Sequence, residues 1–482
     1  MKISDTLTGK KTDFQPRGDV VTMYVCGINP YADSHIGHAM SYIFFDVVRR
    51  YLEFRGYKVK HVENITDVED NIINHANRLG ITVKELTENY AARHFEDMDR
   101  LNNLRPHVMP KATETIPEII ATTQGLIAKG YGYAVGGNVY FRVRQAADYG
   151  KLSKRTFEQM MAGARVEIGE EKEDPMDFVL WKAAKPGEPS WDSPWGKGRP
   201  GWHIECSAMS IKYLGEQIDI HGGGQDVVFP HHENEIAQSE SYTGKKPFVQ
   251  YWMHNGLLQM GAEKMSKSLG NLITIRDFLT KYSADALRLF VLSSYYRNPI
   301  TYTEESIRAA QAGAERLRRV VEKEDAAGTG QALDAKPYYA KFIEAMDDDF
   351  NASQAIAALF DLARDINRAE EEGMDVSEAR RRLRELGGVL GLTFKADEEP
   401  PLDIAPLQKL AASINEKVKA VGVAAAAVTD DADSLMAGLI AVRKELRKAK
   451  QFQLADELRN GLAGLGITLE DTPQGTVWKR KR

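Results

Sequence analysis

The segment from Val20 to Gly56 constrains the fold most, because two hydrophobic patterns meet there. Residues 20–25 form a largely apolar run, which is typical of a buried strand in a parallel sheet. Apolar residues then recur at three-and-four spacing, which predicts a helix; they are Ile36, Met40, Ile43, Phe44, Val47, Val48 and Tyr51. Asp33 or Ser34 is the expected N-cap of this helix. The sequence therefore predicts strand, turn and helix, ending before Gly56.

Two histidines lie in the first turn of this predicted helix. His35 and His38 flank Gly37, which leaves room for a ligand to approach between them. A helix N-terminus carries unpaired N–H groups and a partial positive charge, so it favours a phosphate. Far downstream, Lys264 and Lys267 lie three residues apart among small and hydroxyl residues. Both segments suit an anionic ligand.

The composition indicates a globular protein of several domains. The chain has 482 residues, which is too many for a single hydrophobic core, and 43% of them are apolar. It has no apolar stretch of membrane-spanning length and no signal-like segment, so we expect a cytoplasmic protein that does not bind a membrane. The net charge of -6 argues against a uniformly basic nucleic-acid binder, although local cationic clusters can still bind RNA.

The order of patterns predicts an α/β domain with a doubly wound parallel sheet, split by an insertion. A second strand is expected at 58–65. Beyond Arg105 the pattern changes to a helix, a hairpin around Gly136 and Gly137, and a loop at 181–202 rich in Trp, Pro and Gly. The sheet is expected to resume at 217–220.

The second half of the chain first completes the sheet pattern and then becomes helical. After the strand at 217–220 we expect a glycine turn at 221–226, a helix starting at Pro230 and a strand at 248–254. The remainder is predicted to be helical throughout, with a small terminal domain. The expected parts are 1–104 and 201–271 as the sheet domain, 105–200 as the insertion, 272–326 and 336–396 as helical regions, and 402–482 as the terminal domain.

The two cysteines are candidate metal ligands. Cys26 follows the first strand and Cys206 lies in the segment WHIECS, and two cysteines are too few for a disulfide framework. They are therefore inert, a single cross-link, or ligands. His231 and Glu235 are four residues apart and would share one helical face, where they could complete a tetrahedral zinc site. Such pairs are also common on ordinary surfaces, so the residues alone leave this site open.

These segments resemble those of a known family. The residues from His35 to His38 and from Lys264 to Ser268 match the HIGH and KMSKS elements of class I aminoacyl-tRNA synthetases. Cys26-Gly27, the segments at 202–209 and 229–238, and the chain end at 466–478 resemble the cysteinyl-tRNA synthetase family. Two positions depart from that family's pattern: Asn29-Pro30 replaces an expected Thr-Val, and Met40 replaces a frequent arginine.

The resemblance implies a reaction and a set of site residues. L-cysteine and ATP, which brings Mg²⁺, would give cysteinyl-adenylate and pyrophosphate, and the cysteine would then pass to tRNA(Cys). One Zn²⁺ per chain would select cysteine by its thiolate, and the chain would be a monomer. The implied metal ligands are Cys26, Cys206, His231 and Glu235; the implied catalytic residues are His35, His38, Lys264 and Lys267, with ATP bound by His35, Gly37, His38 and Lys267; the implied substrate contacts are Asn64, Thr66, Trp202, Gly224 and Asp226.

The tRNA contacts are harder to locate. Trp478 lies beside Lys479 and Arg480, which combines a stacking surface with attraction for phosphate. Two alternatives share part of the pattern. One is a cysteine ligase that uses the same adenylate chemistry on an amino-sugar acceptor. The other is a zinc-stabilised nucleotide-binding protein without turnover.

Overall fold

The computed structural model describes residues 1–163, 171–261, 263–264, 272–323, 330–396, 404–429, 431–472 and 475–480. It divides into two compact units, Met1–Ala396 and Asp397–Arg482. Among the helices in these ranges, none combines the length and the apolar character needed to cross a bilayer.

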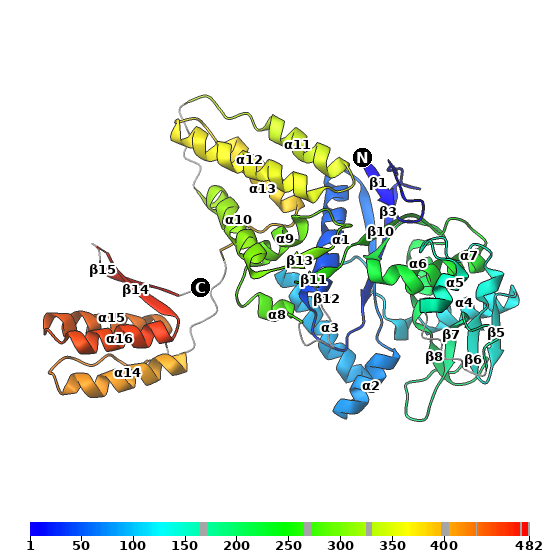
Figure 1. Cartoon of the computed structure of the whole chain (residues 1–482), viewed down its shortest axis with the longest axis horizontal. Coiled ribbons are helices and arrows are strands. Elements are labelled where there is room, and N and C mark those ends of the chain that lie inside the picture. Colours follow the sequence, from blue (N-terminus) through cyan, green and yellow to red (C-terminus); the bar gives the residue numbers. More distant parts are fainter. Residues whose placement is uncertain are drawn as a thin grey trace. The chain divides into compact units, whose positions relative to one another are not determined.

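A four-stranded parallel sheet forms the centre of the first unit, in the order β10-β9-β3-β4. Its strands are β3 (Val20–Ile28), β4 (Lys58–Ile65), β9 (Ile218–Gly224) and β10 (Val249–Asn255). Helix α1 (Ile36–Phe54) covers one face, and α6 (Trp202–Leu214) covers the other (Figure 1). This arrangement confirms the predicted doubly wound α/β fold.

Each strand of this sheet divides its side chains between two cores. In β3, Val21, Met23 and Val25 pack in the core that contains α1, whereas Tyr24 and Cys26 pack with α6. This alternation follows from the period of two in an extended chain. Neighbouring residues of one strand therefore serve different faces.

Helix α1 begins later than its expected caps. Its N-cap is His35 rather than Asp33 or Ser34, whose side chains bond to residues of α3 (Val83–Arg100). Gly56 follows the end of the helix with a φ of 87°, as predicted. Both histidines consequently belong to the first turn, His35 as the N-cap and His38 as the third helical residue.

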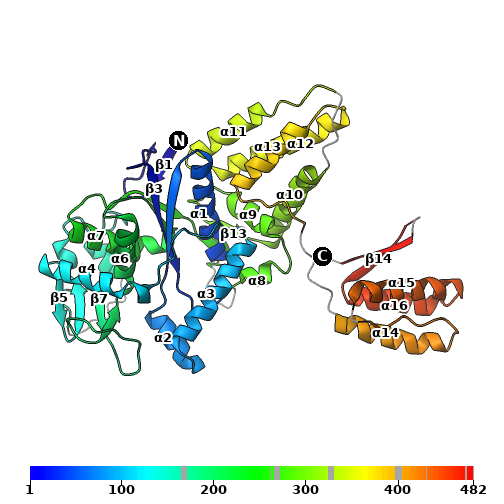
Figure 2. The ribbon, with the colours of Figure 1, turned by 180° about the vertical axis from the view of Figure 1, so that it is seen from behind.

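An antiparallel sheet is inserted between β4 and α6 (Figure 2). Its strands are β5 (Gly132–Val135), β6 (Asn138–Phe141), β7 (Phe178–Ala183) and β8 (Gly198–Pro200), and its helices are α4 (Ile116–Ala128) and α5 (Phe157–Gly163). The hairpin around Gly136 and Gly137 is confirmed. The prediction of a loop at 181–202 is wrong at both ends, because β7 and β8 pair there. The Trp181 ring packs against the bare backbone of Gly198 in this pair of strands.

Strand β9 extends through the segment predicted to be a glycine turn. A Cβ atom on Gly222 would lie 2.2 Å from the Phe45 ring, and one on Gly223 would lie 2.9 Å from the His232 ring. These two glycines therefore allow close packing on both sides of a strand. The turn predicted at 221–226 is therefore wrong for residues 221–224, because glycine also marks such close approaches, and the chain turns only from residue 225.

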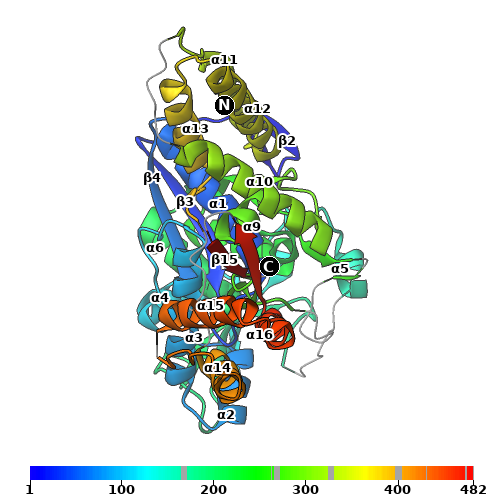
Figure 3. The same ribbon diagram turned by 90° about the vertical axis from the view of Figure 1, so that its left-hand side faces the viewer.

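Helices dominate the rest of the first unit. Figure 3 shows α11, α12 and α13 grouped together. The remaining elements are β1 (Lys2–Asp5), β2 (Lys10–Asp13), α2 (Asp70–Leu79), α7 (Glu233–Thr243), β11 (Leu258–Met260), β12 (Glu263–Lys264), α8 (Ile275–Phe278), α9 (Ala284–Leu292), β13 (Ile300–Tyr302), α10 (Glu304–Glu322), α11 (Lys336–Asp347), α12 (Ala352–Glu371) and α13 (Ser377–Val389).

The second unit is helical except for a terminal hairpin. Its elements are α14 (Ile404–Lys419), α15 (Ala432–Lys448), α16 (Phe452–Gly464), β14 (Ile467–Thr472) and β15 (Gly475–Arg480). The expectation of an all-helical second half is therefore wrong at this end. Ile467 and Leu469 alternate toward the core, which is a strand pattern.

Candidate active site

The central sheet brings the two cysteines together. Cys26 lies near the end of β3 and Cys206 lies in α6, and their Sγ atoms are 4.0 Å apart. Glu235 Oε1 is 3.7 Å from Cys26 Sγ and 3.0 Å from His231 Nε2. Four side chains from three separate segments thus converge, and we call Cys26, Cys206, His231 and Glu235 the ligand cluster.

The ligand cluster has the dimensions of a tetrahedral zinc site. With Zn–S near 2.3 Å and Zn–O near 2.0 Å, tetrahedral angles place two sulfurs about 3.8 Å apart and a sulfur about 3.5 Å from an oxygen. The corresponding separations here are 4.0 and 3.7 Å. Thiolate, imidazole and carboxylate are also the groups that bind zinc in proteins. These residues therefore fit the metal that the family resemblance implies.

His231 lies in the turn before α7 and not on the helix itself. The helix begins at Glu233, three residues after the expected start at Pro230, and Val228–His232 forms a wider π-type turn. Adjacent residues of a regular helix point about 100° apart. Two adjacent side chains of a regular helix would therefore not face the same site. In this wider turn both are buried, His231 with 2% and His232 with 0% of its surface exposed.

Sequence reasoning missed three further histidines beside the ligand cluster. His232 Nε2 lies 3.2 Å from Cys26 Sγ, and together with Cys26, His231 and Glu235 it forms a group that could hold a metal ion. His221 Nε2 lies 2.9 Å from Glu235 Oε2, and His254 Nε2 lies 2.8 Å from His232 Nδ1. The available signal was a histidine at the α6-facing position of each buried strand, β9 and β10.

The charged groups of the ligand cluster shift one another's protonation. Burial alone would raise the pKa of Glu235, but His221 and His231 lower it to about 2. Burial alone would lower the pKa of His231, but Glu235 and Cys206 raise it to about 10. Without a cation, the cluster therefore holds a proton on His231. A metal ion that binds there has to displace that proton.

A buried polar chain supports the backbone at Cys26 and Gly27. The Gly27 N–H donates to Asn64 Oδ1 at 2.9 Å, and Asn64 Nδ2 donates to Thr66 Oγ1 at 3.2 Å. The Thr66 hydroxyl donates to Glu205 Oε2 at 3.0 Å. A Cβ atom on Gly27 would collide with the Asn64 carbonyl oxygen, so only glycine fits there. Asn64 and Thr66 thus lie directly behind the ligand cluster.

The other expected substrate contacts surround the same end of the sheet. Trp202 opens α6 with its side chain partly exposed, and its ring centroid lies 4.4 Å from that of His231. Gly224 ends β9, and Asp226 follows in a short 3-10 turn. The Asp226 carboxylate raises the pKa of His35, although burial, which is the larger effect, leaves that pKa lowered overall. Asp226 therefore acts electrostatically on His35 at the start of α1.

The first turn of α1 presents a neutral donor. The rings of His35 and His38 stack with centroids 3.7 Å apart. The His35 backbone N–H donates to His38 Nδ1 at 3.3 Å, so the proton of a neutral His38 ring lies on Nε2. The His38 side chain is exposed, but desolvation by the surrounding protein and the neighbouring His35 and His94 rings lower its pKa, which favours the neutral ring. With Gly37 between them, these histidines leave the helix N-terminus suited to an anion.

Several predicted residues lie outside the described part of the structure. These are Lys267 and the side chains of Lys264, Lys479 and Arg480. Trp478 is described: it lies opposite Leu469 on β15 and packs against the core of the second unit. Met40, which replaces a frequent arginine, is buried in the core beside α1. The Met40 side chain therefore packs in the core and does not face a ligand site.

Family models match most of the first unit. The model described as the tRNA synthetases class I (C) catalytic domain matches residues 14–312, and a DALR domain model matches residues 341–395. The first match covers more than half of the chain.

Curated relatives match the chain along its full length. A cysteine–tRNA ligase of Dehalococcoides mccartyi is 54% identical over 485 residues, and one of Geobacter sulfurreducens is 48% identical over 497 residues. One of Cronobacter sakazakii is 48% identical over 485 residues. Each match covers 100% of both chains.

Solved structures share the fold at low sequence identity. Mycobacterium tuberculosis methionyl-tRNA synthetase in complex with methionyl-adenylate has a TM-score of 0.57 and 15% identity, covering 77% of this chain and 89% of its own. Agrobacterium radiobacter LeuRS, in a ternary complex with tRNA and LeuAMS, has a TM-score of 0.54 and 11% identity, covering 80% of this chain and 88% of its own. At these identities the likeness concerns the fold alone.

Proposed function

The chain belongs to the cysteine–tRNA ligase family of class I aminoacyl-tRNA synthetases, and from this premise we propose that it joins L-cysteine to tRNA(Cys). ATP activates the cysteine carboxylate as cysteinyl-adenylate and releases pyrophosphate. The cysteine then passes to the 3'-terminal adenosine of the tRNA. Mg²⁺ arrives with ATP and is held largely by its phosphate oxygens. The protein acts as a monomer in the cytoplasm.

The observation that carries this proposal is the convergence of the ligand cluster. Two sulfurs 4.0 Å apart, with an imidazole and a carboxylate beside them, suit one Zn²⁺ per chain. Zinc held there by four protein ligands would accept the substrate's thiolate by expanding to a fifth position, which the neutral hydroxyl of serine fills poorly. The protein groups around that position set its shape. Trp202 borders it on one side, and the chain from Asn64 to Glu205 holds the backbone behind it.

The first turn of α1 receives the nucleotide phosphates in this proposal. His38 Nε2–H and the backbone N–H groups at the helix N-terminus donate to phosphate oxygens, where charge increases as the cysteine carboxylate attacks the α-phosphate. Lys264 and Lys267 supply charge from the other side, and Gly37 keeps the approach open. Gly224 and Asp226 contact the bound substrate near His35.

The helical regions supply the tRNA-binding surface. We assign 1–104 and 201–271 to the catalytic domain, 105–200 to the insertion, 272–326 to a helical stem-contact region, 336–396 to a tRNA-binding bundle and 402–482 to the anticodon-binding domain. Because Trp478 packs against the core of the second unit, deleting the chain end would also damage that core. Replacing Lys479 and Arg480 with alanine is the cleaner test, and should raise the Michaelis constant for tRNA without changing ATP–pyrophosphate exchange.

A metal analysis combined with cysteine-dependent ATP–pyrophosphate exchange tests the proposal. We expect one zinc per chain and exchange that requires cysteine, with serine as a poor substitute. Charging assays with tRNA(Cys) and with an amino sugar separate the proposed acceptor from its nearest alternative. Exchange without tRNA charging, but with transfer to the sugar, would favour that alternative. Absence of exchange in zinc-loaded protein would favour a binding protein without turnover.

A further inference from the structure

A continuous hydrogen-bonded chain leads from Cys26 to the turn after β1. His232 Nε2 lies 3.2 Å from Cys26 Sγ, and His232 Nδ1 lies 2.8 Å from His254 Nε2. His254 Nδ1 in turn lies 2.9 Å from Thr6 Oγ1. Both rings are buried and each uses both of its nitrogens. A neutral imidazole carries one proton, so the position of one proton in this chain determines the next.

Thr6 is held in place by its backbone. Its N–H donates to the Trp252 carbonyl at 2.9 Å, and the Trp252 N–H donates to Asp5 Oδ1 at 3.0 Å. These bonds fix the Thr6 backbone beside Trp252 of β10, and Trp252 lies two residues before His254. The Thr6 hydroxyl therefore meets His254 because of the main-chain pairing.

Arg297 sets the direction of the chain at this end. Its Nη1 donates to Thr6 Oγ1 at 3.1 Å, and its Nη2 donates to the Ser4 carbonyl. Asp349 accepts the Ser4 N–H at 2.7 Å and lies 4.0 Å from Arg297 Nε. A guanidinium group can only donate hydrogen bonds. Thr6 Oγ1 therefore accepts from Arg297, which leaves its own proton available to His254 Nδ1.

The remaining protons follow in order. If the Thr6 hydroxyl donates to His254 Nδ1, the ring proton of His254 lies on Nε2 and is donated to His232 Nδ1. The ring proton of His232 then lies on Nε2 and points at Cys26 Sγ. In this order each ring accepts a hydrogen bond on Nδ1, so each ring is neutral and carries its single proton on Nε2. The reverse order would leave the Thr6 proton without a place in the chain, and would have Cys26 donate to His232 although its Sγ already has Cys206 and Glu235 as acceptors.

We infer that Thr6 and Arg297 are positioning residues that make His232 donate a hydrogen bond to Cys26 Sγ. This inference rests on the proposed function, because it gives the Cys26 sulfur a donor that suits a metal-bound thiolate. Partners behind a metal ligand orient it and change its strength, and their loss commonly costs about 10–100-fold in metal affinity. Neither Thr6 nor Arg297 belongs to the ligand cluster.

Two substitutions of Thr6 separate orientation from packing. Thr6→Val keeps the shape and removes the hydroxyl, whereas Thr6→Ser keeps the hydroxyl. We expect Thr6→Val to weaken zinc about 10-fold or more in a chelator competition on the full-length protein without substrates. Thr6→Ser should restore most of that affinity. Thr301→Val, on the exposed side of β13, is the matched control and should leave zinc affinity unchanged.

A spectroscopic measurement and a second variant make the test specific. In the Co²⁺-loaded protein, losing a hydrogen bond to the thiolate should move the sulfur-to-cobalt absorption band to longer wavelength in Thr6→Val, but not in Thr6→Ser. Arg297→Met should shift the band in the same direction by a smaller amount. The thermal midpoint of each variant, measured in parallel, reports any general loss of folding.

The outcomes distinguish this inference from the proposed function. Wild-type affinity and an unmoved band in Thr6→Val would overturn the inference, and so would a Thr6→Ser variant as impaired as Thr6→Val. An unmoved band in Arg297→Met would overturn the part assigned to Arg297. If the wild-type protein itself binds no zinc or lacks cysteine-dependent exchange, the proposed function fails instead.

Discussion

The two faces of the central sheet use the same strands for different purposes. Toward α1, β3 and β10 present apolar side chains such as Val25 and Met253. Toward α6 and α7, the neighbouring positions of the same strands hold Cys26 and His254. A strand buried on both faces can therefore pack with every second residue and carry chemistry with the residues between.

The face toward α1 has polar exceptions at its edge. His61 and Glu63 of β4 share the alternation of Val59, which packs toward α1. Both are buried, and neither ring nitrogen of His61 has a hydrogen-bond partner within the described residues. Burial raises the pKa of Glu63 to about 8. On the α6 side His232, His254 and Glu235 have hydrogen-bond partners, although His221 Nδ1 and Glu205 Oε1 have none within the described residues. The unpaired His61 ring and the buried Glu63 carboxyl remain costly.

The largest effect is expected on the α6 side, from Glu235→Ala. Removing this carboxylate should abolish stoichiometric zinc and slow cysteine activation by at least about 100-fold, while the Michaelis constant for ATP changes little. Metal analysis and ATP–pyrophosphate exchange measure both effects. Glu240→Ala is the matched control, because Glu240 is also buried in α7 but pairs with Lys151. Undiminished activation without zinc would contradict the expected role.

A substitution on the α1 side should affect stability alone. Ile43 is fully buried in α1, so Ile43→Ala should cost about 2–5 kcal/mol of unfolding free energy through the cavity it leaves. Urea unfolding measures this loss, and zinc per folded molecule should stay the same. Ser41→Ala, at a half-buried position of the same helix, should change stability by less than about 0.5 kcal/mol. Loss of zinc from folded Ile43→Ala protein would show that the faces are not independent.

The exception at the sheet edge predicts a dependence on pH. The pKa of Glu63 is about 8 in the folded protein, above the ordinary value of 4.5, so the folded state keeps a proton that the unfolded chain has released. Stability should therefore be fully present below about pH 4.5 and fall as the pH rises through 8. Glu63→Gln, which cannot ionise, should remove on the order of 2 kcal/mol of this fall. If the thermal midpoints of the wild type and Glu63→Gln change in parallel from pH 5 to pH 8, Glu63 is not the source of the pH dependence.

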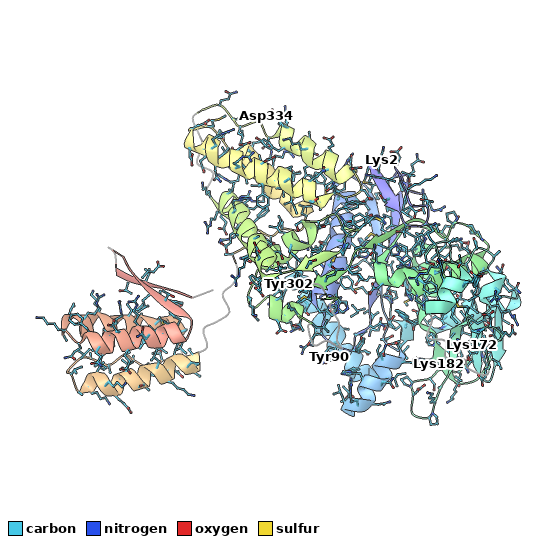
Figure 4. The ribbon with its side chains drawn as sticks, viewed as in Figure 1. Lys2, Tyr90, Lys172, Lys182, Tyr302 and Asp334 are labelled. Atoms are coloured by element: carbon cyan, nitrogen blue, oxygen red, sulfur yellow. The ribbon has the colours of Figure 1, made fainter. Side chains whose placement is uncertain are left out.

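The smallest effect is expected away from both faces. Lys182, labelled in Figure 4, lies on β7 and pairs with Asp70 at the start of α2, as does Arg199. About half of the Asp70 side chain is exposed, so Asp70→Asn should cost less than about 1 kcal/mol, and less again at high salt. Urea unfolding at two salt concentrations measures it. A larger loss would mean that this contact holds the inserted sheet in place.

Local patterns in the sequence predicted the parts of the fold that depend on neighbouring residues. The strand and helix from Val20 to Phe54, the hairpin at Gly136 and most of the later helices follow from spacing within short windows. The end of α1 was also recognisable, because Gly56 adopts the expected positive φ. Such features need no knowledge of the partners across the fold.

The site depends on partners that a single sequence does not reveal. Cys26 meets Cys206 from 180 residues away only because α6 covers the face toward which Cys26 points. His221 joins them because β9 lies beside β3, with His221 opposite Tyr24. The four ligands were named through family resemblance, and the additional histidines were missed because strand order was unknown. The identity of the ligands stays a prediction, although their convergence is observed.

The two bare positions in β9 make the sheet thinnest where its faces differ most. On one side the Phe45 ring rests on the main chain of Gly222, and on the other the His232 ring rests on that of Gly223. No side chain is available there to absorb a displacement. A shift of the Phe45 ring toward the sheet would therefore move peptide groups directly, and those groups would press on the imidazole that faces Cys26.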